Sequence, residues 1–522
     1  MIARLAFRNV ARNPGRSAFL FAGYGIGVGV MIVLLSIGEA LVTQARDERL
    51  VGGGDITVLP AGIDVEVMKT GGLGGLFFSI AQARFIYLQL LASPRLAGSV
   101  TAVAPQIEGK LLYLRANGRE YAVRASGEIP SRTRLVGGMP VVVRGDWQDD
   151  SLDRRWIAPT PAELRADIDH FHVPPPDAAN VESWAEWHYF NVLSDDARRW
   201  AFISFIVGGD VPDGRWGGRV LVTTHEQRGA QGETRTVRYT ADAGSDAVRF
   251  STSTPDLEMD ASSVTLMPDG NYRVRAFARE EGKTASDARV ISVDMVVTPA
   301  PRAYFPGASV GGDGSDFISG YTVPALRARA SGQLCVARSS GGTSTGDCEV
   351  YEGAQAYHDH NWGVWRGVTW EWGETRAGEY TILYGQVQPP DSVAATAPLF
   401  VYIVDSLGFL AIFRPDVIRY TPGSVVDVDG RPVRVPASAV IADARGDDTL
   451  RLELTMEDAS VTDMAQTIVA RGDAGGSGSL PLLERRYFVQ MKGRARLSGR
   501  IDGVPLTGEG PGFFETYVAG RE

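Results

Sequence analysis

The stretch that decides the fold is NYRVRAFARE at residues 271–280, in which apolar and polar side chains alternate. Alternation is typical of a β-strand that buries one face only, because successive side chains point to opposite sides of the sheet. The run TRTVRYTAD at residues 234–242 follows the same rule. Both runs therefore predict strands of an antiparallel sheet, the type that commonly exposes one face to water.

Short runs rich in Val, Ile, Tyr, Phe and Thr continue from about residue 180 to the C-terminus. Many are separated by Gly, Pro, Asp or Asn, and PDGN at 268–271 and VDGR at 428–431 are hairpin-type turns. The 522 residues include 61 glycines and 28 prolines, which favours a turn-rich β fold over a helical one. We expect a mainly β protein built as sandwiches or barrels.

The N-terminus carries a membrane signal. Residues 17–38 contain no charged side chain, and about 20 apolar residues are enough to cross a bilayer as a helix. Four arginines precede this run, namely Arg4, Arg8, Arg12 and Arg16. The positive-inside rule then predicts a cytoplasmic basic segment at 1–16, a transmembrane helix at 17–42, and the bulk of the chain on the periplasmic side of a cell inner membrane. The alternative is a signal peptide cleaved near Thr43-Gln44-Ala45.

Net charge and cysteine content narrow the range of possible functions. The formal net charge is −10, which argues against a nucleic-acid partner because phosphate binding needs a basic face. The two cysteines, Cys335 and Cys348, flank a loop rich in Gly, Ser and Thr and match no zinc-binding spacing. Outside the cytoplasm they are expected to form a disulfide.

The N-terminal segment resembles a known family. RLAFRNVARNPGRSAFLFAGYGIGVGV at 4–30 looks like the first membrane helix of FtsX/MacB-class ABC-transporter permeases, and SVTAVAPQIEGKLLYLRANGREYAVRASGEIP at 99–130 resembles the start of their periplasmic core. The resemblance implies a partial permease-like periplasmic domain at 46–148. No second run long enough to span a membrane occurs, so this chain cannot form a transport path alone. ABC-transporter permease and ATPase subunits are the partners implied.

Three later motifs resemble the AttH/CrtC family of tandem lipocalin-like proteins, which includes secreted hydrolases and carotenoid hydratases. They lie at 182–209, 356–373 and 508–520. Their centres are Glu186-Trp187-His188-Tyr189-Phe190, Asp359-His360-Asn361-Trp362-Gly363 and Gly510-Pro511-Gly512-Phe513-Phe514-Glu515. The resemblance implies two lipocalin-like antiparallel β-barrels, the first at 181–395 and the second at 396–522, after a linker at 149–180.

The expected function is binding of an apolar ligand, a lipid or isoprenoid, by a membrane-anchored protein that works with an ABC transporter. The alternative is a hydratase or hydrolase that acts on such a ligand. An envelope assembly protein that uses the barrels only as interaction surfaces is the third possibility. The chain departs from the family pattern at His188, which stands where an aromatic is usual. It departs again at Gln386, which stands where the hydratases place an acid near Tyr384, and this second departure favours binding over catalysis.

For an enzyme, Asp359 and His360 are the predicted acid and base, since hydration of a double bond needs a proton donor and a base that activates water. The predicted ligand-binding residues are Trp362, His358, Glu186, Trp187, Tyr189, Trp370 and Tyr384. Each has a structural alternative. Asp359 can accept backbone hydrogen bonds at a bend, the tryptophans can be core packing, and Glu515 can pair with an arginine at the barrel mouth.

Metal binding is the remaining possibility. On one strand, His358 and His360 face the same side and Asp359 faces the other. The sequence offers no third ligand at a useful spacing, so we expect no metal site, and no motif calls for a cofactor.

Overall fold

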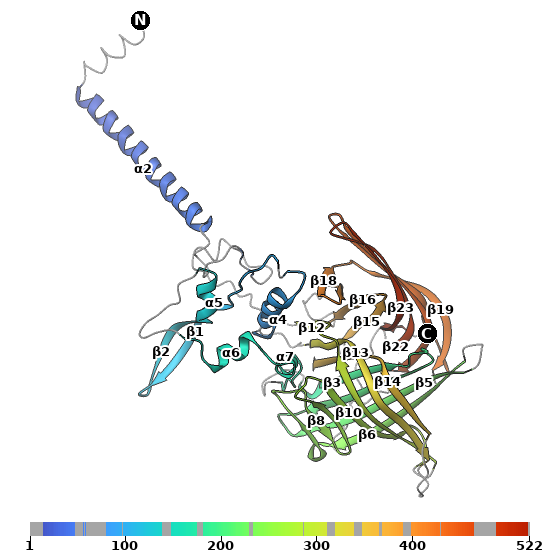
Figure 1. Ribbon diagram of the computed structural model, residues 1–522. Helices are drawn as coiled ribbons and strands as arrows, with labels where there is room; N and C mark the ends of the chain where they lie inside the picture. The colour runs from blue at the N-terminus through green and yellow to red at the C-terminus, as the bar shows by residue number, and fades with distance from the viewer. Residues whose placement is uncertain are drawn as a thin grey trace. The chain divides into compact units, whose positions relative to one another are not determined.

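The fold is taken from a computed structural model (Figure 1). The structure describes residues 14–46, 56, 58, 80–96, 98–137, 148–174, 181–228, 233–284, 287–310, 319–338, 347–364, 368–389, 398–428, 430–463 and 487–519. The chain divides into one unit of residues 1–91 and 96–157 and a second unit of residues 92–95 and 158–522. Arg4, Arg8 and Arg12 of the predicted cytoplasmic segment lie outside the described residues.

The first unit begins with helix α2 (Pro14–Arg46). Its stretch Pro14–Val33 is long and apolar enough to cross a membrane, and none of that stretch is buried. The remaining elements are helix α4 (Ile80–Ala92), an antiparallel hairpin of β1 (Gln106–Ala116) and β2 (Arg119–Glu128), and the short helices α5 (Pro130–Leu135) and α6 (Ser151–Ile157). The hairpin lies within residues 46–148, the segment expected to form a partial permease-like periplasmic domain.

The second unit opens with helix α7 (Pro161–Ile168), held at its N-terminus by a capping box between Thr160 and Glu163. A closed, eight-stranded antiparallel barrel follows, and hydrogen bonding between β10 and β11 closes it. Its strands are β3 (Trp184–Leu193), β4 (Arg199–Asp210), β5 (Arg215–Arg228), β6 (Glu233–Gly244), β10 (Tyr272–Glu280), β11 (Arg289–Pro299), β13 (Ser319–Arg338) and β14 (Asp347–Val364). The alternation expected for NYRVRAFARE is present, because Tyr272, Val274, Ala276 and Ala278 are buried and Arg275, Phe277 and Arg279 are exposed.

Short elements complete the barrel. They are η2 (Val181–Ser183), η3 (Ser245–Ala247), β7 (Val248–Phe250), β8 (Leu257–Met259), β9 (Ser262–Leu266) and β12 (Phe305–Val310). Strands β7 to β9 extend the sheet beyond β10, and β12 pairs with β13.

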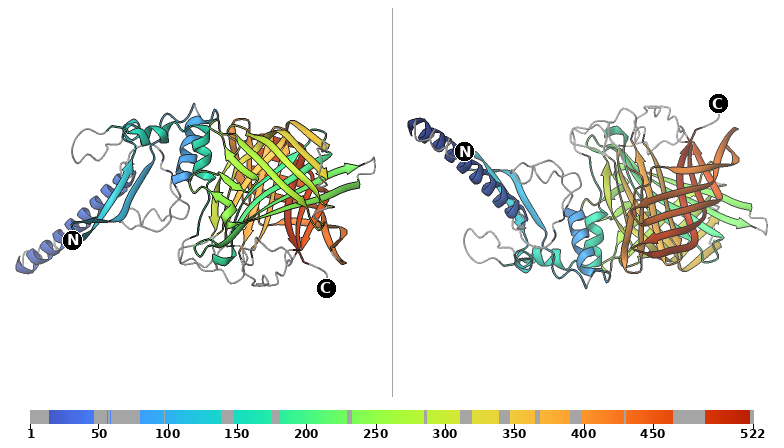
Figure 2. Two further views of the ribbon diagram at one scale, coloured as in Figure 1. Left: turned by 90° about the horizontal axis from the view of Figure 1, so that it is seen from below. Right: turned by 90° about the horizontal axis from the view of Figure 1, so that it is seen from above.

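A second, nine-stranded antiparallel sheet lies beside the barrel, coloured orange to red in Figure 2. In chain order its strands are β15 (Thr369–Ala377), β16 (Tyr380–Gln388), β17 (Phe400–Asp405), β18 (Gly408–Phe413), β19 (Ile418–Val428), β20 (Arg431–Arg445), β21 (Asp448–Asp463), β22 (Tyr487–Ile501) and β23 (Val504–Val518). The sheet curls until its edge near β18 meets β20. The contacts there are individual bonds, from the Arg414 N–H to Asp443 (2.8 Å) and from the Arg445 guanidinium to the Ile412 carbonyl (3.3 Å).

The chain passes from the barrel to the second sheet between β14 and β15, at residues 364–369. The expected boundary near 395 is therefore too late. The proline-containing segment that suggested it joins β16 to β17, which pair with each other inside the second sheet. A loop between neighbouring strands of one sheet and a loop between two sheets have the same turn-rich composition, so the sequence could not separate them.

Three apolar layers result: the barrel core, the core of the second sheet, and a layer between the two sheets that we call the seam. Bonds across the seam fix the sheets against each other. Trp372 donates its indole N–H to the Tyr357 hydroxyl (2.9 Å), and the Arg376 guanidinium donates to the backbone carbonyls of Ala328 (2.6 Å) and Ala356 (2.9 Å). Strand β3 and residues 356–360 of β14 are consequently buried on both faces, one toward the lumen and one toward the seam.

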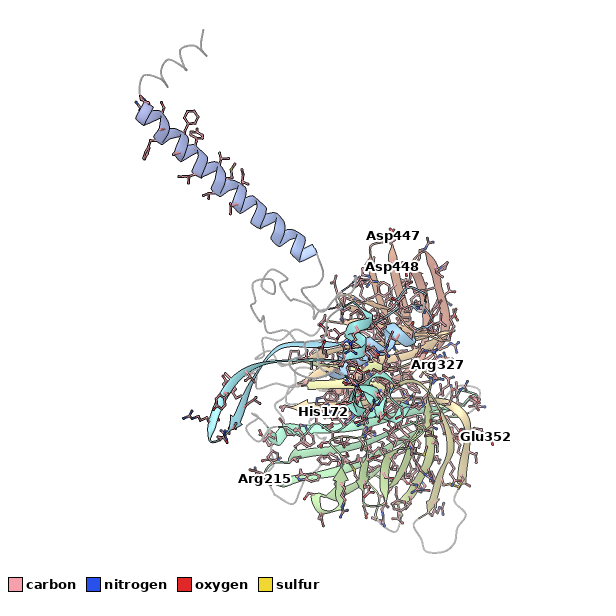
Figure 3. All side chains as sticks on the ribbon, turned by 60° about the vertical axis from the view of Figure 1, so that its left-hand side comes forward. His172, Arg215, Arg327, Glu352, Asp447 and Asp448 are labelled. Carbon is pink, nitrogen blue, oxygen red and sulfur yellow. A yellow bond between two sulfur atoms is a disulfide. The ribbon has the colours of Figure 1, made fainter. Side chains whose placement is uncertain are left out.

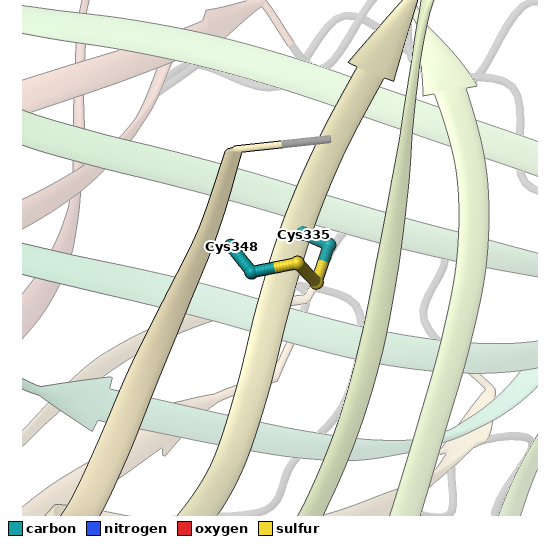
Figure 4. Close-up of a disulfide and its surroundings, with 2 residues drawn as sticks. All are labelled: Cys335 and Cys348. Atoms are coloured by element: carbon teal, nitrogen blue, oxygen red, sulfur yellow. A yellow bond between two sulfur atoms is a disulfide. The ribbon is translucent and has the colours of Figure 1, made fainter. Parts of the chain in front are cut away.

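Cys335 of β13 and Cys348 of β14 form a disulfide (Figure 4). The two residues are directly opposite each other in the antiparallel ladder, and their sequence separation is 13. The bond ties together the far ends of the two longest barrel strands.

Candidate functional site

The two central motifs lie side by side on paired strands. In the ladder between β3 and β14, His360 is opposite His188, Trp362 is opposite Glu186, and Asp359 is opposite Tyr189. Because directly opposed residues share a face, the even-numbered side chains turn into the barrel lumen and the odd-numbered ones turn into the seam. The prediction that His358 and His360 face one side, away from Asp359, is confirmed by their shared contact with Asp169.

The lumen holds a group of buried polar residues that we call the lumen cluster: Asp169, Glu186, His188, His358 and His360, each 0% exposed. Asp169 is its centre. Its carboxylate lies 2.6 Å from His360 Nδ1, 3.1 Å from His358 Nε2 and 3.7 Å from His188 Nδ1. The Tyr272 hydroxyl donates to the same carboxylate at 2.6 Å.

A second carboxylate links the cluster to its outer rim. Glu186 lies 2.8 Å from His360 Nε2 and accepts the backbone N–H of His172 at 2.8 Å. The ring of His172, labelled in Figure 3, lies 3.1 Å from Glu186 and stacks flat on Trp362, with 3.7 Å between ring centroids. The His172 side chain is 27% exposed, so it connects the buried network to solvent.

These contacts set the charges of the cluster. Burial alone would lower the pKa of His360, but its hydrogen bonds to Asp169 and Glu186 outweigh burial and raise the pKa to about 9. Burial would raise the pKa of Asp169 and of Glu186, yet the histidines around them hold both pKa values below the usual range. Burial and the charge of His360 together lower the pKa of His188 well below its usual value. His360 is therefore an imidazolium between two carboxylates, and His188 is neutral.

Asp169 and His172 were missed at the sequence level, because residues 149–180 were expected to be a linker. That interpretation is wrong for residues 168–172, which are packed inside the barrel: Phe171 is 1% exposed and contacts the rings of His188 and His360. A signal was available. Asp169-His170-Phe171-His172 contains two of the six histidines, and with His188, His358 and His360 five of the six gather here.

The seam holds four further predicted residues. Asp359, Tyr189, Trp187 and Trp370 lie there with Tyr357, Trp372 and the two further carboxylates Glu374 and Glu515. Asp359 accepts a hydrogen bond from the Asn361 amide at 2.6 Å. Trp187 of β3 and Trp370 of β15 are half-buried, with ring centroids 6.1 Å apart.

Glu515 accepts two hydrogen bonds in the seam. The Trp370 indole N–H donates to it at 2.9 Å, and the Gln490 amide donates to it at 3.0 Å. The expected pairing of Glu515 with an arginine is replaced by these two neutral donors.

Burial raises the pKa values of the seam carboxylates. Burial and the nearby charge of Glu515 raise the pKa of Asp359 well above its usual value, and burial raises the pKa of Glu515 itself. Burial also raises the pKa of Glu374 to about 7, against the opposing influence of Arg376. The pKa of Tyr189 is raised well above normal by burial and by the charges of Glu515, Asp359 and Glu374, which places Tyr189 among all three acids.

Glu374 borders a small cavity. Its volume is about 10 Å³, near the minimum that one water molecule needs. The lining includes Asn191, whose amide lies 3.4 Å from the Glu374 carboxylate, together with Gln355, Arg376 and Phe513. The cavity therefore places a space of about one water molecule next to an acid whose pKa is about 7.

The structure separates several residues that were expected to act together. His360 and Asp359 lie on opposite faces of β14, so they do not form one acid–base pair. Tyr384 lies in neither compartment. It belongs to the core of the second sheet, where its ring packs over Gly373 and where Glu371 accepts a 2.5 Å bond from the Tyr420 hydroxyl. Gln386 on β16 stands where the hydratases are expected to have an acid. Its direct partner on β15 is Glu371, so the neighbouring strand carries a carboxylate at this position.

The lumen cluster contains the one group of metal-ligand type found among the described residues, formed by Asp169, His188 and His358. Their nearest ligand atoms lie within 4.8 Å of one another. The group's third candidate ligand, Asp169, comes from the segment taken for a linker, whereas the sequence offered no third ligand at a useful spacing.

Fold and site describe a mainly β protein with a closed, lipocalin-like barrel, a second large sheet and one apolar N-terminal helix. No family model matches the chain, and no curated protein matches it significantly. The resemblance to ABC-transporter permeases thus finds no support among family models.

Solved structures that align with the chain include a protein assigned as AttH from Nitrosomonas europaea, with 16% identity over 67% of this chain and 97% of that chain and a TM-score of 0.41. Kievitone hydratase from Nectria haematococca aligns with 14% identity over 67% of this chain and 94% of that one (TM-score 0.37). CghA, solved with Sch210972, aligns with 14% identity over 69% and 96% (TM-score 0.35). Likenesses this distant do not carry function over to this chain.

Proposed function

We propose that this chain is an acid–base enzyme that adds water to, or removes it from, an apolar unsaturated ligand held in the seam. The observation that carries the proposal is Glu374, a buried carboxyl with a pKa of about 7 beside a water-sized polar cavity. A general base works best when its pKa lies near the working pH, and a free glutamate is far too acidic for that role. The hydratase alternative drawn from the sequence motifs is thereby preferred to binding alone.

Asp359 supplies the second half of the chemistry. Its raised pKa favours the protonated form, and a protonated carboxylic acid can give its proton to one carbon of a double bond. The neighbouring carbon then becomes a cation, and the faces of aromatic rings such as Tyr189 and Trp372 stabilise positive charge. Water from the cavity attacks the cation and passes a proton to Glu374, which gives an alcohol. The reverse sequence removes water.

The aromatic composition of the seam favours an apolar substrate. Trp187 and Trp370, one from each sheet, are half-buried and mark the edge of the seam from which a ligand would enter. Aromatic walls with a few polar groups are typical of pockets for apolar small molecules. An isoprenoid or similar lipid has the double bonds that this chemistry needs.

We propose further that the protein is anchored in a membrane by α2 and faces an oxidising compartment. The apolar stretch Pro14–Val33 and the Cys335–Cys348 disulfide support this placement, since disulfides persist outside the reducing cytosol. Partnership with an ABC transporter remains a prediction of the N-terminal motif. Co-purification of the full-length chain with an ATPase subunit in mild detergent would support it, and repeated isolation of the chain alone would count against it.

The catalytic proposal can be tested with labelled water. The full-length protein in mild detergent is incubated in H₂¹⁸O with isoprenoid alkenes and tertiary alcohols, and oxygen incorporation is followed by mass spectrometry. We expect incorporation with the wild type and a loss of about 10²-fold or more in Glu374→Gln. Glu509→Gln is the matched control, because Glu509 is an exposed residue of the same sheet that pairs with Arg496. Ligand that stays bound and unlabelled would show that the protein binds without reacting.

A further inference from the structure

In the lumen cluster, two histidine nitrogens face the same carboxylate. His188 Nε2 lies 2.9 Å from the Pro255 carbonyl, and His358 Nδ1 lies 3.0 Å from the Tyr189 carbonyl. A carbonyl oxygen only accepts hydrogen bonds, so each of these two nitrogens carries a proton. The other nitrogens, His188 Nδ1 and His358 Nε2, both face Asp169, at 3.7 Å and 3.1 Å.

One of these two nitrogens has no partner. His188 Nδ1 is fully buried and makes no hydrogen bond, and an Asp169 oxygen lies 3.7 Å from it. Buried polar atoms without a partner are rare and costly. The hydrogen bond between His358 Nε2 and Asp169 leaves His188 Nδ1 without a partner. One metal ion placed between the three groups would contact both nitrogens and the carboxylate, whose ligand atoms lie within 4.8 Å of one another.

We propose that Asp169, His188 and His358 bind a divalent first-row transition ion such as Zn²⁺. Two imidazoles and one carboxylate form a ligand set used for zinc and for non-haem iron, whereas Ca²⁺ and Mg²⁺ prefer oxygen ligands alone. Bonds of about 2.1 Å place neighbouring donors about 3.0–3.4 Å apart. The observed separations of 3.1 Å and 3.7 Å between the Asp169 oxygens and the two nitrogens need only small adjustments.

The surroundings match those of metal sites in proteins. Metal-bound histidines usually donate their other ring N–H to a backbone carbonyl or a carboxylate, as His188 and His358 do here, and metal-bound carboxylates are themselves hydrogen-bonded. Asp169 takes such bonds from Tyr272 and His360. Phe171 packs its ring edge-on to His188, with 5.1 Å between centroids, and shields the site from water.

The ion would fasten the segment before the barrel to two of its strands, because Asp169 precedes β3 whereas His188 and His358 lie on β3 and β14. The site is on the opposite face of these strands from Asp359 and is independent of the proposed catalysis. No ligand is a cysteine, so the disulfide and the metal site do not compete.

The test measures zinc in tag-free, full-length protein in mild detergent. We expect about one zinc per chain after gel filtration, loss of at least ten-fold in zinc affinity for His188→Asn, and unchanged binding for His225→Asn. His225 is the matched control because it is a buried barrel histidine outside the cluster that stacks on Trp200. A folded wild type that binds no zinc, or equal zinc in all three proteins, would overturn the proposal.

If His188→Asn fails to fold, X-ray absorption on the zinc-loaded wild type decides the question. Imidazole nitrogens and a carboxylate oxygen at about 2.0–2.2 Å support the site, and a shell of oxygen alone refutes it. A rise in the melting temperature on adding zinc, reversed by a chelator, is expected together with the first result.

Discussion

Asp359 and His360 are adjacent in the sequence but belong to different compartments: Asp359 lies in the seam with Tyr189, and His360 lies in the lumen against Asp169. The cause is the two-residue period of a strand that is buried on both faces. The Asp-His-x-Trp motif therefore serves two networks at once, and its two halves can be disabled separately.

The seam carboxylates make stability depend on pH. The folded pKa of Glu374 is about 7, above the 4.5 expected when unfolded, so between these values the folded state holds a proton that the unfolded state has lost. Stability from this group is full below pH 4.5 and falls as pH rises to 7, by about 3 kcal/mol. We expect Glu374→Gln to flatten the fall in the free energy of unfolding between pH 5 and 8. An equal fall in wild type and variant would contradict the burial of this acid.

Asp169 should be among the most sensitive positions in the chain. Replacing it with Asn leaves His360 with one carboxylate instead of two and weakens the bonds to Tyr272 and His358. Breaking a buried ion pair costs about 3–5 kcal/mol, which chemical denaturation can measure. Asp242→Asn is the comparison, since Asp242 is 60% exposed and pairs with Arg219 at the surface, where about 0–1 kcal/mol is expected. Similar losses in the two variants would refute the central role of Asp169.

The disulfide should contribute measurably to the barrel. A sequence separation of 13 corresponds to about 3 kcal/mol in the chain-entropy account. We expect the double variant Cys335→Ser, Cys348→Ser to lower the melting temperature, and a reducing agent to lower that of the wild type alone. A wild-type melting temperature unaffected by complete reduction would show that the ladder between β13 and β14 holds these strand ends without the bond.

The apolar helix predicts a membrane-bound protein with its barrel outside the cytoplasm. In intact bacterial spheroplasts, added protease should degrade the barrel, and carbonate washing should leave the N-terminal segment in the membrane pellet. Release of the whole chain by carbonate, with a new N-terminus near residue 46, would identify a cleaved signal peptide instead.

Much of the fold was predictable, because the alternation in NYRVRAFARE and the turn at 268–271 reflect local geometry. The boundary between the sheets was not predictable, because the amino-acid composition of the segment between β14 and β15 does not differ from that of the other loops. For the site, the two-residue period of a strand correctly predicted that Asp359 and His360 lie on opposite faces. The participation of Asp169, His172 and Glu374 did not, because contacts between residues 100 or more positions apart depend on tertiary packing.

The central claim is that the reaction takes place in the seam and not in the lumen. The most direct measurement compares ¹⁸O incorporation from labelled water by folded Asp359→Asn and folded His188→Asn, one change on each face of the paired strands. The account predicts that Asp359→Asn loses incorporation by about 10²-fold or more, while His188→Asn retains it per folded molecule. Loss of ¹⁸O incorporation in His188→Asn, with full incorporation in Asp359→Asn, would contradict the account. It would indicate that the reaction takes place at the histidines of the lumen.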